Sequence, residues 1–508
     1  ARILAFPCFF VVDKSSIAIR MTLEVGARVQ VGSDKASVRY LGPVEGVKGE
    51  WVGLEWDEPS RGKHDGLVKD KRYFTTRHPT GGSLVRPNLI STGEDLETAV
   101  AHRYGSDENA DDFVVGSKRV EMIGLEKGRQ RNLSALRVIV LDHMAVNGAG
   151  KETGEPRFPY CKEINLYGNL LRRWRDVVDI LMQTPRCEEL VLSSNFLEEI
   201  PEGTDLARDF EPRTSVLRLT LNRCRLDERT IARCLLIFPS IEELYAATNG
   251  LASFGLSSPL PSSLTLIDLE DNAIESFECI RALADLPNLT KLSLARCKLK
   301  SVRIDGSQAF SQLHTLNLKG NEICDWESIG QLRKLQSLAT LYIDFERLHA
   351  EFGMDPREVI IAKLPSLRNL ERCELSVIER RSAEIRYLNK YSAMDEERKR
   401  KEKHEEDLKR LEQEHGAPVM DNAKSKQMNI VKIVFASGEK TLPARSIPTS
   451  LTVAKVLEMG RKLFKIEREE EIGAALDQDG FLIDLEYVMR PLAFYEPQNG
   501  NIIRIRTL

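Results

Sequence analysis

A repeating leucine pattern in the middle of the chain restricts the fold more than any other feature of the sequence. The template LxxLxLxxNxL recurs at spacings of roughly 23 to 29 residues, which is the range of leucine-rich repeats. Alternate residues of a short strand point inward, and each unit can bury its apolar face only against its neighbours. The pattern therefore predicts an α/β leucine-rich-repeat solenoid. Its copies are LRVIVLDHMAV from Leu136, CKEINLYGNLL from Cys161, CEELVLSSNFL from Cys187, VLRLTLNRCRL from Val216, IEELYAATNGL from Ile241, LTLIDLEDNAI from Leu264, LTKLSLARCKL from Leu289, LHTLNLKGNEI from Leu313 and LATLYIDFERL from Leu338.

The cysteines of the chain fit this pattern. Cys161 and Cys187 stand at the first leucine position of the template, and Cys224 and Cys297 stand at its asparagine position. None of the nine cysteines belongs to a CxxC pair, which argues against a zinc ribbon or a disulfide framework. We therefore expect small buried residues in a protein of a reducing compartment.

The outward face of the predicted strands is a candidate protein-binding surface, because solenoids commonly bind partners on their concave side. The residues at the centre of this face are mixed and mostly uncharged, which favours a protein partner over nucleic acid. Tyr245, Asp268 and Tyr342 are the candidate contact residues, and the two tyrosines fit ordinary surface positions equally well. The whole row is Asn165, Val191, Thr220, Tyr245, Asp268, Ser293, Asn317 and Tyr342.

The C-terminal part of the chain predicts a small independent domain. MNIVKIVFA, from Met428, alternates as a strand does, SLTVAKVLEMGRKLFK has one apolar helical face, and NIIRIRTL, from Asn501, reads as a closing strand. This order resembles the ubiquitin-like β-grasp fold. Because the chain ends in Arg-Thr-Leu rather than Gly-Gly, the resemblance is to a built-in domain and not to a conjugated modifier.

Two further segments separate or precede the domains. Met394–Gly416 has Glu and Lys at helical spacing but almost no apolar stripe, so we expect a solvated helix or linker, with a partner-binding helix as the alternative. Ile3–Val12 is apolar but too short to span a bilayer, and no cleavage pattern follows it. We expect an N-terminal extension at 1–20 that is non-essential or upstream sequence. The domains that follow are a small all-β domain at 21–95, a linker at 96–117, the solenoid and its cap at 118–390, a charged helical linker at 391–426 and the β-grasp domain at 427–508.

The stretch GEWVGLEWDEPSRGKHDG, from Gly49 to Gly66, raises the question of chemistry. A phosphate-binding loop needs GxxxxGK[ST] between a strand and a helix, whereas His64 follows Lys63 here. His64 and Asp65 are adjacent, so their side chains would diverge on a strand and form a poor metal pair. We find no activated nucleophile nearby and predict no catalysis, no metal and no cofactor. The net charge of −4 gives no argument for nucleic acid or membrane binding.

Residues 23–90 resemble a CAP-Gly domain, on the marks ASVRYLG, GEWVGLEWD, GKHDG, RYF and VRP. CAP-Gly domains recognise acidic C-terminal tails that end in an aromatic residue, as in α-tubulin. The resemblance implies that Lys63 and the residue after it meet the terminal carboxylate, and that Trp51 lines the apolar part of a groove. Residues 35–90 carry an excess of Lys and Arg over Asp and Glu, which suits an acidic partner. The implied tail-binding residues are Trp51, Gly62, Lys63, His64, Asp65, Gly66, Leu84 and Arg86.

Two positions depart from the usual CAP-Gly pattern. His64 stands where the family commonly has Asn, and Leu84 stands where it commonly has an aromatic residue. His64 can still donate a hydrogen bond, and its protonation can tune affinity. We expect Trp56 and Phe74 to pack in the core of the domain.

The order of CAP-Gly domain, leucine-rich repeats, charged connector and ubiquitin-like domain resembles the tubulin-folding cofactor E family. The resemblance implies a non-enzymatic, cytoplasmic and cytoskeleton-associated chaperone. Its implied partners are α-tubulin, the αβ-tubulin heterodimer and the tubulin-folding cofactors B, C and D, with proteasome or ubiquitin-pathway proteins as further candidates for the ubiquitin-like domain. A microtubule-binding adaptor and a ubiquitin-pathway scaffold are the alternatives.

Overall fold

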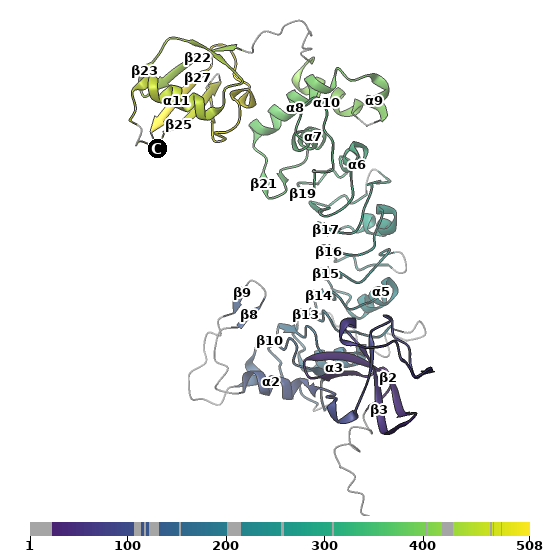
Figure 1. The fold of residues 1–508 in the computed structure, drawn as a ribbon. Coiled ribbons are helices and arrows are strands. Elements are labelled where there is room, and N and C mark those ends of the chain that lie inside the picture. Colours follow the sequence, from purple (N-terminus) through teal and green to yellow (C-terminus); the bar gives the residue numbers. More distant parts are fainter. Residues whose placement is uncertain are drawn as a thin grey trace, which may run out of the picture. The chain divides into compact units, whose positions relative to one another are not determined.

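The computed structural model divides the chain into two compact units, Ala1–Ser376 with Arg400–His404, and Val377–Lys399 with Glu405–Leu508 (Figure 1). The expected N-terminal extension, residues 1–20, lies outside the described residues. The structure describes residues 23–105, 113–115, 118–120, 132–151, 154–200, 215–255, 259–306, 309–401, 404–418, 430–467, 470, 472–478 and 480–507.

The N-terminal domain is a small antiparallel sheet. Its strands are β1 (Arg28–Val31), β2 (Asp34–Val44), β3 (Val47–Trp56) and β6 (Gly82–Val85), and they are hydrogen-bonded in that order. Alternate residues such as Val38, Val52 and Leu54 fill one buried core, as period-two strands require. The expected small all-β domain is therefore confirmed. Its short elements are the hairpin β4 (Leu67–Val68) and β5 (Lys71–Arg72), and the 3₁₀ turns η1 (Pro59–Arg61) and η2 (Pro87–Leu89).

The leucine repeats form one sheet of 11 strands, which confirms the predicted solenoid. Figure 1 shows its strands following one another in sequence order along the solenoid. Neighbours pair in parallel, except that the last strand runs antiparallel to the one before it. In each strand from β12 to β19 the middle residue is buried and its two neighbours are half-buried, except that Lys291 of β17 is exposed. The strands are β10 (Val138–Val140), β12 (Glu163–Asn165), β13 (Glu189–Val191), β14 (Arg218–Thr220), β15 (Glu243–Tyr245), β16 (Leu266–Asp268), β17 (Lys291–Ser293), β18 (Thr315–Asn317), β19 (Thr340–Tyr342), β20 (Asn369–Leu370) and β21 (Cys373–Glu374).

Asparagine side chains connect each repeat to the one before it. Asn272 Nδ2 donates to the carbonyl oxygens of Ala246 and Leu269 at 3.0 and 2.8 Å, and its Oδ1 accepts from the backbone N–H groups of Asn249 and Leu251. All these groups are buried or half-buried, so the asparagine satisfies donors and acceptors that water does not reach. Asn169, Asn195, Asn249 and Asn321 make the corresponding contacts with their own preceding repeats.

Cysteine replaces this asparagine in two repeats, as the sequence predicts. Cys224 Sγ donates to the Leu192 carbonyl at 3.3 Å, and Cys297 Sγ donates to the Leu269 carbonyl at 3.2 Å. Burial raises the pKa of the Cys224 thiol to about 12 and that of Cys297 to about 11, which makes both thiols poor nucleophiles. These cysteines are structural residues of the solenoid.

The connections between strands are helices or 3₁₀ turns with one apolar face. In α5, for example, Asp227 caps the N-terminus by accepting from the Thr230 N–H, and Ile231 and Leu235 are buried. These elements are α3 (Trp174–Gln183), α5 (Glu228–Ile237), η5 (Phe277–Asp285), α6 (Trp326–Leu332) and α7 (Pro356–Lys363).

The start of the expected linker at 96–117 is folded against the first repeat. Strand β7 (Glu94–Asp95) pairs in parallel with β11 (Val146–Gly148), and helix α2 (Leu96–Tyr104) follows it. The backbone N–H of Val140 donates to the buried Tyr104 hydroxyl at 2.8 Å. Tyr104 thereby covers the exposed edge of β10, which would otherwise leave unpaired backbone groups. Further elements here are η4 (Leu133–Ala135), β8 (Phe113–Val115) and β9 (Lys118–Val120).

The second unit contains the expected ubiquitin-like β-grasp domain, and its fold is confirmed. Its sheet has the order β23-β22-β27-β25-β26, with β24 pairing with β22, and helix α11 contributes Val453 and Val456 to the core. Thr452 lies at the N-cap of α11. The elements are β22 (Ile430–Ser437), β23 (Lys440–Thr441), β24 (Arg445–Pro448), α11 (Val453–Phe464), β25 (Ile472–Gln478), β26 (Phe481–Asp484), η6 (Leu492–Tyr495) and β27 (Ile502–Thr507).

The charged connector is more structured than its sequence suggests. It contains α9 (Glu396–Lys401) and α10 (Glu405–His415), and α10 packs on α8 (Val377–Tyr391). Leu408 and Leu411 of α10 are buried, so this segment is not a fully solvated helix. Among the helices of the described residues, none is long and apolar enough to cross a membrane.

Candidate functional site

The predicted tail-binding residues of the N-terminal domain lie along strand β6 and its neighbour β3. Gly82 opposes Glu55, Leu84 opposes Gly53, and Val85 opposes Val52. Residues 82, 84 and 86 point to the same side of the strand, because side chains alternate. The row from Gly82 to Arg86 therefore spans about 13 Å at the usual rise of a strand.

The GKHDG turn is fastened to one end of this row. The backbone N–H groups of Lys63 and His64 donate to the Gly82 carbonyl at 2.7 and 3.2 Å, and the Gly82 N–H donates to the His64 carbonyl at 2.7 Å. A side chain at Gly62 would put its Cβ 2.0 Å from the Thr80 carbonyl oxygen, so only glycine allows this approach. The Lys63 side chain is exposed, and among the described residues no hydrogen bond or ion pair engages its ammonium group.

His64 lies inside the turn and accepts a backbone hydrogen bond. Its Nδ1 accepts from the Gly66 N–H at 3.0 Å, and its ring lies 5.8 Å from the Phe74 ring. An accepting Nδ1 leaves the proton of the neutral imidazole on Nε2, which can then donate to a ligand. Burial lowers the pKa of His64, Asp65 opposes that shift, and Lys63 adds to it.

We expect the Gly66 amide to report the titration of His64. Since the pKa of His64 is depressed on folding, the neutral form stabilises the turn above the ordinary histidine value of about pH 6.5, and that stabilisation is lost as the pH falls through the lower folded pKa. The Gly66 resonance of isotope-labelled glycine in the full chain should shift with a midpoint below 6.5. In His64→Asn the shift should vanish. A midpoint above 6.5 would contradict the assignment.

Asp65 organises the turn, and the negative charge of its carboxylate is paired with Arg72. Its Oδ1 accepts from the Leu67 N–H at 3.2 Å, and its Oδ2 pairs with Arg72 Nη2 at 2.9 Å. The Arg72 guanidinium holds the pKa of the Asp65 carboxyl below its usual range. Asp65 therefore presents little repulsion to an acidic peptide, and its contacts are within the domain.

Trp51 and Arg86 form the other end of the row. The guanidinium carbon of Arg86 lies 3.9 Å from the centre of the Trp51 ring, and Arg86 Nη1 donates to the Lys48 carbonyl at 2.8 Å. Arg86 thus supports Trp51 and the β2–β3 hairpin. Leu84 is half-buried between the two ends. Trp56 and Phe74 are buried, as expected of core residues, and Trp56 Nε1 donates to Ser83 Oγ at 3.0 Å.

Tyr40 and Tyr73 border the same face and were not among the predicted site residues. Their rings meet edge-on at 5.3 Å, and the Tyr73 hydroxyl accepts from the Glu45 N–H at 2.9 Å. A Cβ at Gly53 would come within 2.8 Å of the Tyr40 Cβ, which places Tyr40 over the centre of the row. Both tyrosines occur in the motifs RYLG and RYF, so their presence was visible in the sequence although their pairing was not.

The candidate residues of the repeat face lie in register. The row from Asn165 to Tyr342 aligns across β12 to β19, so that Tyr245 neighbours Asp268 directly. The Tyr245 hydroxyl donates to Glu243 Oε2 at 2.8 Å, and burial, with help from Glu243, raises the pKa of Tyr245 well above its ordinary value. Tyr342 lies three strands from Asp268, or about 14 Å at the usual strand spacing.

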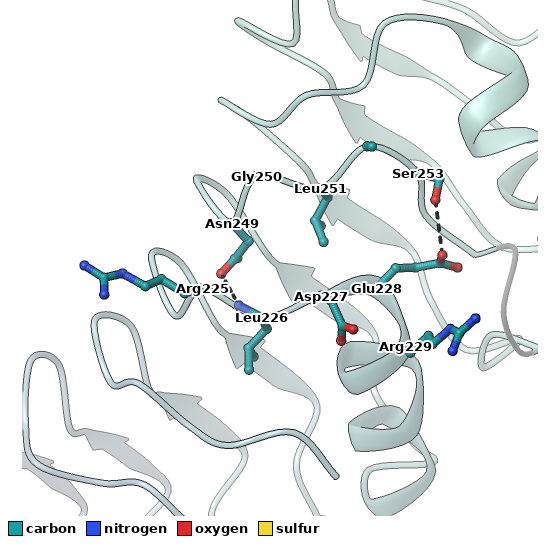
Figure 2. Close-up of a pocket in the computed structure, with 10 residues that line it drawn as sticks. Arg225, Leu226, Asp227, Glu228, Arg229, Asn249, Gly250, Leu251 and Ser253 are labelled. Carbon is teal, nitrogen blue, oxygen red and sulfur yellow. Dashed lines mark hydrogen bonds between the residues drawn. The ribbon is translucent and has the colours of Figure 1, made fainter. Parts of the chain in front are cut away.

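A surface hollow of about 350 Å³ lies elsewhere on the solenoid (Figure 2). Its polar atoms serve the fold, since Asn249 Oδ1 accepts from the Leu226 N–H at 3.2 Å and Ser253 Oγ donates to Glu228 Oε2 at 3.2 Å. None of the predicted site residues lines it. The lining consists of Arg225, Leu226, Asp227, Glu228, Arg229, Asn249, Gly250, Leu251, Ala252 and Ser253.

One cluster of the second unit has ligand types that metals use. Single ligand atoms of Glu384, Glu414 and His415 lie within 4.8 Å of one another. However, His415 Nε2 lies 2.9 Å from Glu384 Oε2, and Arg380 and Arg410 lie 3.5 and 3.2 Å from the two carboxylates. One ion pair within each of α8 and α10, and the His415–Glu384 contact between the two helices, account for this cluster.

Comparisons with known proteins find relatives that cover nearly the whole chain. The CAP-Gly domain family matches residues 25–90. Tubulin-specific chaperone E of Mus musculus is 33% identical over 521 residues, which cover 95% of this chain and 98% of that protein, and the Homo sapiens protein is 31% identical over 95% of this chain and 98% of its own length. The solution structure of the C-terminal ubiquitin-like domain of mouse tubulin-specific chaperone E is 22% identical, covers 17% of this chain and 95% of that domain, and has a TM-score of 0.15.

Proposed function

The chain belongs to the tubulin-specific chaperone E family, and from this premise we propose that it is a tubulin-folding chaperone that captures α-tubulin. In this proposal the groove along β6 holds the acidic C-terminal tail, and the face of the repeats holds the folded body. The protein acts in the cytoplasm with other tubulin cofactors to assemble and dissociate the αβ-tubulin heterodimer. It is not an enzyme.

The observation that carries the proposal is the exposed Lys63, whose backbone is hydrogen-bonded to Gly82 at one end of the β6 row. A peptide that ends in a carboxylate needs a cationic donor at its terminus and an apolar surface before it. Lys63 and the Nε2 side of His64 supply the donors at the Gly82 end, and Leu84 with Trp51 supplies the apolar surface toward Arg86. These groups come from the GKHDG turn, β6 and β3, and their order from the Gly82 end to the Arg86 end suits an extended tail.

The two binding surfaces would act together. Each weak contact raises the effective concentration of the partner at the other surface, so that the combined affinity can exceed either one by orders of magnitude. The ubiquitin-like domain is then free to dock a second tubulin cofactor or a protein of the degradation machinery. The stretch from Gly49 to Gly66 lacks a phosphate-binding motif, and in this proposal any nucleotide in the complex is bound by tubulin.

Replacing Lys63 by alanine should weaken binding of an α-tubulin tail peptide by about 10- to 100-fold, because a hydrogen bond to a charged group is typically worth 1.5–3 kcal/mol. Calorimetric titration of the full chain measures this loss. Lys69→Ala removes another exposed lysine of the same domain and should leave the affinity unchanged. A peptide without its final aromatic residue should bind weakly to both proteins. Equal binding of intact and truncated peptides would contradict the tail groove.

Native gels of the full chain with αβ-tubulin distinguish a chaperone from a microtubule adaptor. A chaperone should bind free tubulin and convert heterodimers into a complex with α-tubulin. An adaptor should leave heterodimers intact and sediment with microtubules instead.

A further inference from the structure

Phe196 lies between two arginines that come from different domains. It follows the asparagine of the repeat CEELVLSSNFL and is only half-buried, so its ring is not part of the solenoid core. The guanidinium carbon of Arg28, on β1 of the N-terminal domain, lies 4.5 Å from the ring centre. That of Arg225, in the next repeat, lies 3.9 Å from it. Both distances are within the range of cation–π attraction.

Asp57 connects the same two arginines. Arg28 Nη1 donates to Asp57 Oδ1 at 2.6 Å and Arg28 Nη2 pairs with Asp57 Oδ2, which makes a two-pronged ion pair. Arg225 Nη2 donates to the Asp57 backbone carbonyl at 3.1 Å. The four residues therefore form a closed cluster, which we call the Phe196 clamp: Arg28, Asp57, Phe196 and Arg225.

The two arginines of the clamp are largely withdrawn from water. Only 1% of the Arg28 side chain is exposed, and burial, with a further contribution from Arg77, lowers the pKa of Arg225. Removing a guanidinium from water is costly unless charged and polar partners compensate it. Asp57 and Glu55 of the N-terminal domain supply the opposite charge, so a solenoid arginine is compensated by carboxylates of the other domain.

Other contacts between described residues of the two domains lie at separate points of the solenoid. Lys35 Nζ lies 2.7 Å from His143 Nδ1 beside the first repeat, and Asn147 Nδ2 donates to the Thr92 carbonyl at 2.8 Å. Arg172 pairs with Glu24 at 2.9 Å after the second repeat. Contacts at several repeats resist rotation of one domain against the other more than a single contact does.

We propose that Phe196 is a positioning residue that locks the N-terminal domain onto the solenoid through the Phe196 clamp. The lock holds the β6 groove in a fixed geometry relative to the repeat face. The gain in partner affinity that follows rests on the proposed function, because it requires that one tubulin molecule occupies both surfaces. A fixed geometry gives a higher effective concentration than a flexible tether of the same length.

Distances between spin labels test the lock without any partner. One label is placed at Ser33→Cys, on the exposed β1–β2 turn, and the other on the exposed Cys324 of the solenoid, after Cys8, Cys279 and Cys373 are replaced by serine. The full chain should give a narrow distance distribution. Phe196→Ala, and Phe196→Leu if the alanine variant is poorly folded, should broaden it at least twofold. Tyr160→Ala removes an aromatic–arginine contact inside the solenoid, with Arg186 at 5.5 Å, and should leave the width unchanged.

Binding measurements then separate the lock from the proposed function. Phe196→Ala should bind the isolated tail peptide as the unchanged chain does, and should bind αβ-tubulin about tenfold more weakly because the two surfaces no longer act as one. An unchanged distribution width in Phe196→Ala would overturn the assignment of the lock to Phe196. A broadened distribution with unchanged tubulin affinity would overturn its role in binding. Loss of the tail interaction in the unchanged chain would contradict the proposed function and leave the distance result standing.

Discussion

Alanine in place of Gly66 should disrupt the tail-binding turn severely, because it combines an unfavourable backbone conformation with a collision. Gly66 has φ 95°, a conformation that side chains rarely adopt, and a Cβ here would lie 2.2 Å from the Phe74 carbonyl oxygen. The unfavourable φ alone costs about 1–2 kcal/mol, and the collision forces the backbone of residue 74 to move, so we expect a total of roughly 3–5 kcal/mol. Tail-peptide binding should become undetectable.

Gly32→Ala is the matched control for this prediction. Gly32 also has a positive φ, of 64°, but nothing lies within 4 Å of the position of its Cβ. Gly32→Ala should therefore carry the cost of the unfavourable φ without a collision of its Cβ. Hydrogen exchange measured by mass spectrometry in the full chain should show faster exchange of residues 51–74 in Gly66→Ala than in Gly32→Ala. Equal exchange in the two variants would show that the close approach to Phe74 is unimportant.

Asn272→Ala should destabilise the solenoid by roughly 2–5 kcal/mol, because buried polar groups that lose a partner typically cost 1–3 kcal/mol each. The substitution removes an acceptor from the Asn249 and Leu251 N–H groups and a donor from the Ala246 and Leu269 carbonyls. Urea unfolding followed by far-ultraviolet circular dichroism measures the loss. Hydrogen exchange should locate it in strands β15 to β17.

Two further variants provide comparisons for the loss of stability in Asn272→Ala. Asn288→Ala removes an exposed asparagine that donates to the Ser262 carbonyl, and should cost well under about 1 kcal/mol. The loss of stability in Asn272→Cys should lie between the losses in the two alanine variants. Cys224 and Cys297 show that a thiol at this position still donates to the preceding repeat, although it offers no comparable acceptor. A cysteine variant as unstable as the alanine variant would mean that the thiol hydrogen bonds contribute nothing.

The solenoid could be predicted from the sequence because its information is local. The leucine spacing sets which residues of each strand are buried, and the aligned copies predict that Tyr245 neighbours Asp268, as the register shows. The same holds for the roles of Cys224 and Cys297. The aligned copies do not predict that the Tyr245 hydroxyl donates a hydrogen bond to Glu243. The predicted contacts of the repeat face with tubulin stay predictions.

The candidate groove was predicted less completely, because its side chains find partners far away in the sequence. The sequence does not indicate that the Arg86 guanidinium stacks on Trp51 and donates to the Lys48 carbonyl, and its contact with the tail stays a prediction. Asp65 is similarly occupied by Arg72. The edge-on pair of Tyr40 and Tyr73 depends on how two strands and a hairpin meet, and spacing within one strand does not encode that.

The connector shows the limit of counting apolar residues. Helix α10 has few of them, but Leu408 and Leu411 are separated by three positions and therefore lie on one face. That narrow stripe is enough to pack on α8, where His415 also pairs with Glu384. Phe196 is a comparable case, since a half-exposed aromatic residue in a repeat gives no sign in the sequence of the two arginines around it.

The direction of the asparagine contacts has a consequence for biosynthesis. Asn195, Asn249, Asn272 and Asn321 each donate to a carbonyl of the repeat that precedes them, and each accepts from N–H groups of that same repeat. A chain leaves the ribosome with its N-terminal repeats first, and domains generally fold in that order. Every newly emerged repeat therefore meets a folded template whose open polar groups it completes. The solenoid can grow one repeat at a time during translation, without waiting for sequence that has not yet been made.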